Sequence, residues 1–136
     1  MKDKFKQFYM KTAWNCAQLS HCQRLKTGAI IVQDSSIIAY GYNGTPRGDN
    51  NACEIDNVTK ETVIHAEMNA IAKVARSTNS CFGASIFVTH SPCVECSKAI
   101  LQAGIKHFYY SDLYRKEDGL QMLISHGILC EMVKGE

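Results

Sequence analysis

The sequence predicts an α/β fold, a three-layer α/β/α sandwich built on a mixed five-stranded sheet. Short apolar segments with strand character alternate with segments in which apolar residues recur every three or four positions, the spacing of an amphipathic helix. The expected order is helix, hairpin, helix, strand, helix, strand, helix, strand. Strands separated by helices pair in parallel, and the helices then cover both faces of the sheet.

Length and composition indicate one globular domain. The chain has 136 residues, of which 46% are hydrophobic and 21% are charged, a balance typical of folded proteins. No internal repeat, low-complexity segment or linker divides the sequence, so we expect a single domain over residues 1–136. The formal net charge of +2 is too small to indicate a nucleic-acid partner.

The first part of the chain predicts a helix, a hairpin and a loop. Apolar side chains at three- and four-residue spacing predict a helix from residue 3 to about 20. A polar connector leads to two strands at 28–33 and 36–41, which a two-residue turn joins. Residues 42–51 are rich in Gly, Pro, Asn and Asp and predict a loop. Loops of this kind often carry binding residues.

The second part alternates helix and strand. A helix is expected from 62 to about 76, with Thr62 as its cap, which places His65 and Glu67 in its opening turns. Pro92 suits the first turn of the following helix, because a proline there loses no hydrogen bond. The remaining elements are a strand at 84–89, a helix at 93–103, a strand at 105–110, a helix at 117–125 and a strand at 128–133.

Two short motifs carry a metal-site pattern, H-A-E at residues 65–67 and P-C-V-E-C at 92–96. One imidazole and two thiolates suit Zn²⁺ with an open fourth position for water. Cys93 and Cys96 lie one helical turn apart, so both sulfurs can face the same point. A helix N-terminus favours the thiolate form that a metal requires. We therefore expect one zinc ion on His65, Cys93 and Cys96.

Glu67, two residues after the histidine, is expected to be the catalytic proton shuttle. A bound zinc ion lowers the pKa of its water from about 16 to about 7. The combination of H-x-E with P-C-x-x-C is the signature of zinc deaminases that act on nucleobases. In such a reaction Glu67 would take a proton from the zinc-bound water and deliver it to a ring nitrogen of the base and then to the departing ammonia.

Other interpretations of these motifs explain less of the sequence. The C-x-x-C alone, after a strand and at the start of a helix, also fits a thioredoxin-like redox pair. That interpretation leaves His65 and Glu67 without a role. A zinc ribbon would need a second C-x-x-C, which the sequence lacks.

The N-terminal sequence indicates a cytoplasmic protein, and this location bears on the cysteines. The N-terminus has no apolar run of the kind that directs secretion, and no stretch approaches membrane-spanning length. Seven cysteines in the cytoplasm are expected to stay reduced. Cys22 and Cys53 could pair around a second metal, but no companion ligands are evident, and we expect free thiols.

Several longer motifs resemble the deoxycytidylate (dCMP) deaminases of the cytidine-deaminase-like superfamily, over nearly the whole chain. The zinc motifs mark the superfamily, whereas the loop at 41–48 and a late Tyr-Arg segment indicate nucleotide substrates. The motifs are S-H-C-Q-R-L-K-T-G-A-I-I-V at 20–32, G-Y-N-G-T-P-R-G at 41–48, H-A-E-M-N-A at 65–70, S-P-C-V-E-C at 91–96 and Y-R-K-E-D-G-L at 114–120. His90 departs from the pattern, because an apolar residue is more usual there.

The resemblance implies a cytidine-deaminase-like fold and the hydrolysis of dCMP to dUMP and ammonia. It implies the zinc ligands and the role of Glu67 given above. The implied substrate contacts are Asn43 with the sugar, the Ala66 N–H with the pyrimidine carbonyl, and Arg24, Tyr114, Arg115 and Lys116 with the 5′-phosphate.

The resemblance also implies regulation. Many members of the family form homohexamers that dCTP with Mg²⁺ activates and dTTP inhibits. We therefore expect a homo-oligomer, with a hexamer favoured, and a regulatory site near Gly44, Thr45 and Arg47. These three residues could equally form a plain turn.

Two other functions remain open from the sequence. The first is a zinc deaminase with another substrate, either a free nucleoside or a base of RNA, although RNA editors favour a more basic surface. The second is a non-catalytic zinc-binding module, for which Glu67 would have no use.

Overall fold

The computed structural model describes residues 1–114 and 116–135 and centres on one mixed sheet. The strand order is β2-β1-β5-β6-β7. Strand β1 runs antiparallel to both of its neighbours, whereas β5, β6 and β7 run parallel. The strands are β1 (Gly28–Gln33), β2 (Ser36–Tyr42), β5 (Ser85–His90), β6 (His107–Asp112) and β7 (Leu129–Met132). The predicted mixed five-stranded sheet is confirmed.

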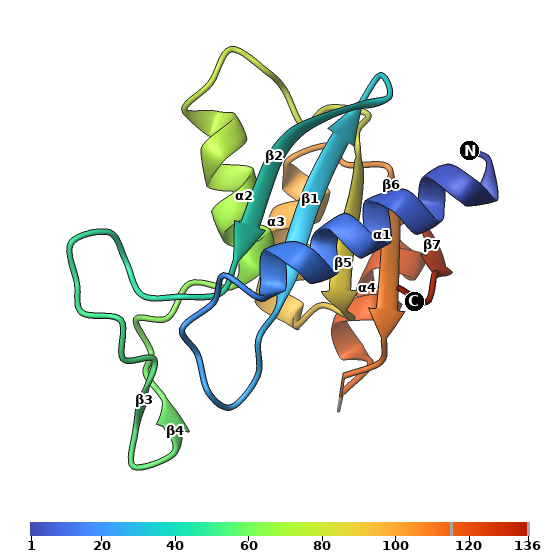
Figure 1. The fold of residues 1–136 in the computed structure, drawn as a ribbon. Coiled ribbons are helices and arrows are strands. Elements are labelled where there is room, and N and C mark those ends of the chain that lie inside the picture. The colour runs from blue at the N-terminus through green and yellow to red at the C-terminus, as the bar shows by residue number, and fades with distance from the viewer. Residues whose placement is uncertain (115, 136) are drawn as a thin grey trace.

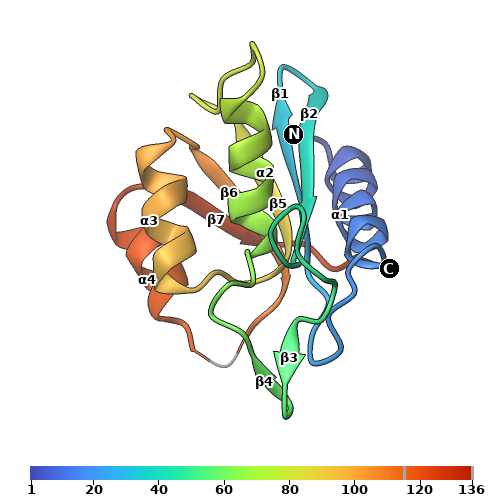
Figure 2. The same ribbon diagram turned by 90° about the vertical axis from the view of Figure 1, so that its left-hand side faces the viewer.

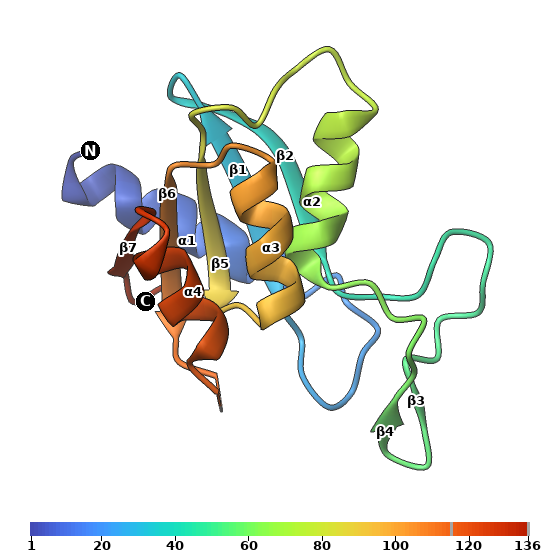
Figure 3. The same cartoon turned by 180° about the vertical axis from the view of Figure 1, so that it is seen from behind.

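Four helices cover the two faces of this sheet. Helix α1 lies alone on one face (Figure 1), and α2, α3 and α4 lie side by side on the other (Figures 2 and 3). The helices are α1 (Asp3–Ala17), α2 (Ala66–Ala75), α3 (Val94–Gln102) and α4 (Asp118–Ser125). The three-layer arrangement therefore agrees with the sequence prediction. None of the helices in the described part of the chain is both long and apolar enough to cross a membrane.

Neighbouring strand residues supply the two apolar layers. Ile30 and Phe87 belong to the layer under α1, together with Met10 of that helix. Ile31 follows Ile30, and Ile86 precedes Phe87. Both belong to the layer under α2, α3 and α4. Successive side chains of a strand point to opposite faces, so apolar runs such as residues 29–32 bury both faces of the sheet.

The N-cap of helix α2 lies three residues later than the sequence indicates. His65 is its N-cap and Thr62 is not, so the predicted cap is wrong. The reason is a contact distant in sequence: Ile64 and Gly44 exchange two backbone hydrogen bonds, of 2.7 and 3.1 Å. These bonds hold residue 64 extended and delay the helix.

Helix α3 begins in the same manner. Its N-cap is Cys93, and Pro92 precedes that cap, so the expected place of Pro92 in the first turn is wrong. The Cys93 sulfur accepts a hydrogen bond from the Cys96 N–H. His65 and Cys93 thus hold equivalent places, each immediately before the first residue of its helix. The predicted stop at Gly104 is confirmed, because this glycine has a φ of +83° that favours a residue without Cβ.

A short hairpin is absent from the sequence prediction. Strands β3 (Glu54–Ile55) and β4 (Val58–Thr59) pair only with each other, and the hairpin projects from the body of the molecule (Figure 1). A disulfide between Cys22 and Cys53 fastens its base to the connector after α1. The expectation of free thiols is therefore wrong, because the fold brings these two Cα atoms to 5.1 Å, a normal disulfide separation.

Replacement of Gly41 by alanine tests the close packing of β2 against α2. A Cβ on Gly41 would lie 2.4 Å from the Ala66 carbonyl oxygen and 2.7 Å from the Ala70 nitrogen. We expect Gly41→Ala to lower the free energy of unfolding by about 1–3 kcal/mol, the usual cost of overpacking. Chemical denaturation measures this difference.

Gly44→Ala is the matched control, since a Cβ at Gly44 would meet no atom within 4 Å. It should leave the free energy of unfolding nearly unchanged. Equal losses in the two variants would show that the approach of β2 to α2 does not limit stability.

Candidate zinc and nucleotide site

A cavity of about 300 Å³ lies at the edge of the sheet where β5 ends. His65, Glu67 and Cys93 line it from the N-terminal ends of α2 and α3. Arg24 and Tyr114 line it from the connector after α1 and from the segment after β6. In α/β folds the carboxyl ends of parallel strands are the usual place for a ligand. The cavity therefore brings together members of both sets of residues that the sequence singled out, those of the zinc motifs and those expected to contact the substrate.

Three metal-binding side chains meet at one end of this cavity. His65 Nδ1 lies 3.3 Å from the Cys96 sulfur and 3.4 Å from the Cys93 sulfur. Together they form a group that could hold a metal ion. One nitrogen and two sulfurs match a catalytic zinc site that keeps one position open.

The protonation of the two sulfurs fits a divalent cation. A hydrogen bond from Cys96 lowers the pKa of Cys93 to about 4, and the same bond together with burial raises the pKa of Cys96. Two adjacent sulfurs repel each other when both are charged, so only a nearby cation stabilises both thiolates. Both thiols are free, unlike the bonded Cys22–Cys53 pair. His65 adds a third donor that a redox pair does not use, so the donor set suits zinc better than redox chemistry.

A second group, formed by Cys22, Cys53 and Glu54, is structural. Its sulfurs are bonded to each other. The Glu54 carboxylate accepts hydrogen bonds from the backbone N–H groups of Gln23 and Arg24, at 3.1 and 3.2 Å. These contacts hold the connector that carries Arg24 against the β3–β4 hairpin.

Glu67 lies buried beside the ligand cluster and lines the cavity. Burial raises the pKa of its carboxyl to about 7, although its own backbone N–H and the nearby His65 act in the opposite direction. A carboxyl group that titrates near neutrality can both accept and return a proton. The proton-transfer role of Glu67 stays a prediction.

Asn43 lines the same cavity, and its side chain is already engaged. Its Oδ1 accepts the Thr27 N–H at 2.9 Å, and its Nδ2 donates to the Leu25 carbonyl at 2.7 Å. One Nδ2 hydrogen remains for a ligand, since a side-chain amide has two. Ala66 is the first residue of α2, where backbone N–H groups have no partner within the helix.

Other predicted residues lie away from the cavity lining. Lys116 is exposed and does not line the cavity, and Arg115 lies outside the described residues. Gly44 pairs with Ile64, and Thr45 Oγ1 donates to the Asn50 carbonyl at 2.6 Å. Arg47 is exposed on the same loop.

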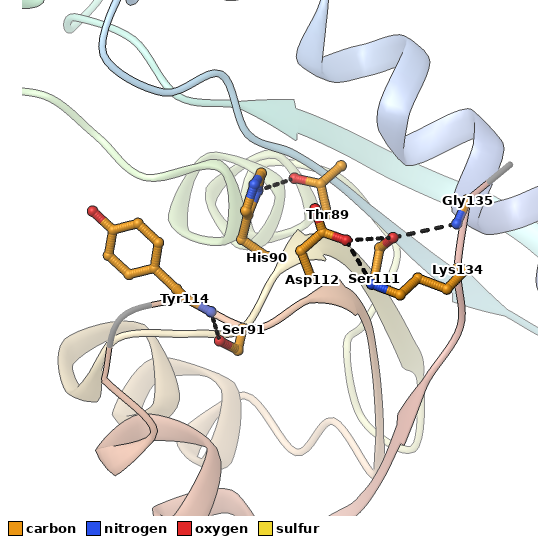
Figure 4. Close-up of polar contacts among 8 residues, drawn as sticks. All are labelled: Thr89, His90, Ser91, Ser111, Asp112, Tyr114, Lys134 and Gly135. Atoms are coloured by element: carbon orange, nitrogen blue, oxygen red, sulfur yellow. Dashed lines mark hydrogen bonds and ion pairs between the residues drawn. The ribbon is translucent and has the colours of Figure 1, made fainter.

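Two contributors to the cavity had little signal in the sequence. Ser91 accepts the Tyr114 N–H through its Oγ at 2.7 Å (Figure 4), and so holds a residue that lines the opening. His90 lines the cavity as well. Its departure from the family pattern was the available signal, and it left open whether His90 would line the pocket or merely cover it.

Comparison with known proteins agrees with this geometry. The family model for the cytidine and deoxycytidylate deaminase zinc-binding region matches residues 3–112. ComE operon protein 2 of Bacillus subtilis (strain 168) is 41% identical over 134 residues, covering 94% of this chain and 70% of its own length. Deoxycytidylate deaminase of Enterobacteria phage T4 is 32% identical over 149 residues, with coverages of 79% and 77%.

A solved structure resembles the whole fold. The dCMP deaminase from the cyanophage S-TIM5, crystallised in complex with dCMP and dUMP, aligns with a TM-score of 0.94. It is 47% identical in sequence, and the match covers 97% of this chain and 99% of that one. From its sequence match and its fold, the protein belongs to the cytidine and deoxycytidylate deaminase family.

Proposed function

We propose that the protein is a zinc-dependent deaminase that hydrolyses dCMP to dUMP and ammonia. The observation that carries this proposal is one cavity lined both by His65, Cys93 and the buried Glu67 and by Arg24 and Tyr114. The similar cyanophage enzyme binds dCMP and dUMP, which supports the same substrate here. This activity accounts for both ends of the cavity.

The reaction needs a metal ligand set and a group that moves protons. His65, Cys93 and Cys96 would hold the zinc ion, which when bound supplies a Lewis acid that makes water nucleophilic near neutral pH. Glu67 accepts a proton from the attacking water and delivers it to the ring nitrogen next to the amino-bearing carbon. The same carboxyl then transfers the second proton to the departing ammonia, so that water and dCMP yield dUMP and ammonia.

Residues around the ligand cluster orient the nucleotide. In this proposal the free Nδ2 hydrogen of Asn43 meets the sugar, and the Ala66 N–H meets the pyrimidine carbonyl. Arg24 and Tyr114 bind the 5′-phosphate, with Arg115 and Lys116 from the adjoining segment. A guanidinium group matches phosphate oxygens in charge and geometry. Glu54 supports this role, because it anchors the backbone of the Arg24 segment.

The proposal extends to assembly and regulation, on the strength of the family resemblance. In this proposal the protein is a cytoplasmic homohexamer of single-domain chains, and its Cys22–Cys53 disulfide is an exception to the reduced state of most cytoplasmic thiols. Its activity would increase with dCTP and Mg²⁺ and decrease with dTTP. The loop that carries Gly44, Thr45 and Arg47 would bind these regulators, because it is exposed in part and adjoins Asn43 of the cavity.

Replacement of Glu67 by glutamine separates catalysis from metal binding. Glutamine keeps the size of the side chain but cannot transfer a proton, so ammonia release from dCMP should fall by about 10²-fold or more. The zinc content per chain should stay unchanged. Turnover within a few-fold of the unsubstituted enzyme would remove Glu67 from the mechanism.

Replacement of Arg24 by glutamine tests phosphate recognition. We expect kcat/KM for dCMP to fall by roughly 10-fold or more, since a charge-assisted hydrogen bond is lost, while kcat/KM for deoxycytidine changes little. Lys26→Gln is the matched control, because this nearby exposed cation does not line the cavity. Equal losses on the nucleotide and the nucleoside would contradict a phosphate contact at Arg24.

A further inference from the structure

His90 is a polar residue of the cavity that the mechanism above does not use. It is the last residue of β5, is half-buried and lines the same cavity as His65 and Tyr114. The Trp14 ring packs against its imidazole, with centroids 5.4 Å apart and an interplanar angle of 65°. The ring is therefore held at the cavity wall, and its chemistry depends on which nitrogen carries the proton.

Thr89 determines the position of that proton. Its side chain is fully buried, and its Oγ1 accepts the Gly28 N–H at 3.1 Å. The same oxygen lies 2.8 Å from His90 Nδ1 (Figure 4). A hydroxyl group has one proton to donate, and across residues 1–114 and 116–135 no other acceptor is seen for it. The hydroxyl therefore donates to Nδ1, which places the proton of the neutral imidazole on Nε2.

One oxygen of the carboxylate next to His90 in the sheet is engaged elsewhere. Asp112 is the Cα partner of His90 in β6. Its Oδ1 accepts from Lys134 Nζ at 3.1 Å and from the Ser111 hydroxyl at 3.3 Å, on the side away from the imidazole (Figure 4). Burial lowers the pKa of His90, against the opposing effect of Asp112, which agrees with a neutral ring. No acceptor for the Nε2–H is seen among residues 1–114 and 116–135, so this donor remains available to the contents of the cavity.

We propose that His90 binds the substrate by donating its Nε2–H to an oxygen of the sugar–phosphate part of the nucleotide, and that Thr89 is the positioning residue that sets this donor. This inference rests on the proposed function. In that function the ring acceptors of cytosine, N3 and the carbonyl oxygen, face Glu67 and Ala66 of α2. The opposite ring edge carries only C–H groups, so a donor from β5 finds its acceptors on the sugar or phosphate.

Two substitutions at His90 separate the hydrogen bond from packing. His90→Phe keeps a ring against Trp14 but has no donor, and we expect its KM for dCMP to rise by about 5-fold with kcat changed less than 2-fold. His90→Gln keeps a donor and should recover most of the loss. An unchanged KM in His90→Phe, or no recovery in His90→Gln, would overturn the role of His90.

Parallel measurements with deoxycytidine identify the oxygen. A loss for both substrates indicates a sugar oxygen, and a loss for dCMP alone indicates the phosphate. An unsubstituted enzyme that releases no ammonia from dCMP contradicts the proposed function itself. Normal turnover with no effect in His90→Phe contradicts only the inference about His90.

The tautomer can be observed directly in the zinc-loaded protein without substrate. Nitrogen-15 NMR of the labelled imidazole should show the proton of His90 on Nε2. Thr89→Ser keeps the hydroxyl and should keep this tautomer, whereas Thr89→Val should populate the Nδ1–H form. Thr89→Val also leaves the Gly28 N–H unpaired, so this variant could unfold. The deciding measurement is therefore made on the unsubstituted protein. An Nδ1–H tautomer of His90 in that protein refutes the role of Thr89.

Discussion

The close approach of two helix N-termini is the constraint on which the site depends. His65 and Cys93 each precede a helix, and α2 and α3 lie side by side so that His65 Nδ1 reaches both sulfurs within 3.4 Å. Glycines on other elements permit this arrangement. Gly41 of β2 lies against the Ala66 backbone, and a Cβ on Gly119 of α4 would lie 2.2 Å from the Pro92 carbonyl oxygen. Each of the two metal-binding motifs, at residues 65–67 and 92–96, therefore packs against a glycine.

The two ends of the cavity differ in construction. Helix ends and strand ends hold the ligand cluster and Glu67, and this rigidity suits groups whose geometry must be fixed. Connecting segments supply Arg24 and Tyr114. Glu54 and the Cys22–Cys53 disulfide hold the segment with Arg24, and Ser91 holds the backbone of Tyr114. Chemistry that the family shares can therefore be separated from substrate selection, because loops can change without moving the helices.

The sequence predicted the features that local patterns determine. Apolar periodicity was enough for the five-stranded sheet, and the spacing of Cys93 and Cys96 was enough for the ligand pair. The errors came from contacts between distant residues. The Gly44–Ile64 bridge displaced the start of α2, and the Cys22–Cys53 bond joins residues 31 positions apart. The donor state of His90 depends on Thr89 and Gly28, and no sequence pattern indicates that chain of contacts.

If His65, Cys93 and Cys96 hold one zinc ion that the reaction requires, metal content and turnover must change together. Zinc content and ammonia release from dCMP can be measured side by side for the protein as purified, after chelation and after titration with Zn²⁺. We expect one zinc ion per chain, loss of turnover on chelation, and recovery complete at one equivalent. Cys96→Ala should lose both zinc and activity, whereas Cys130→Ala, at a free thiol in β7, should keep both. Full turnover in the zinc-free protein would contradict the account.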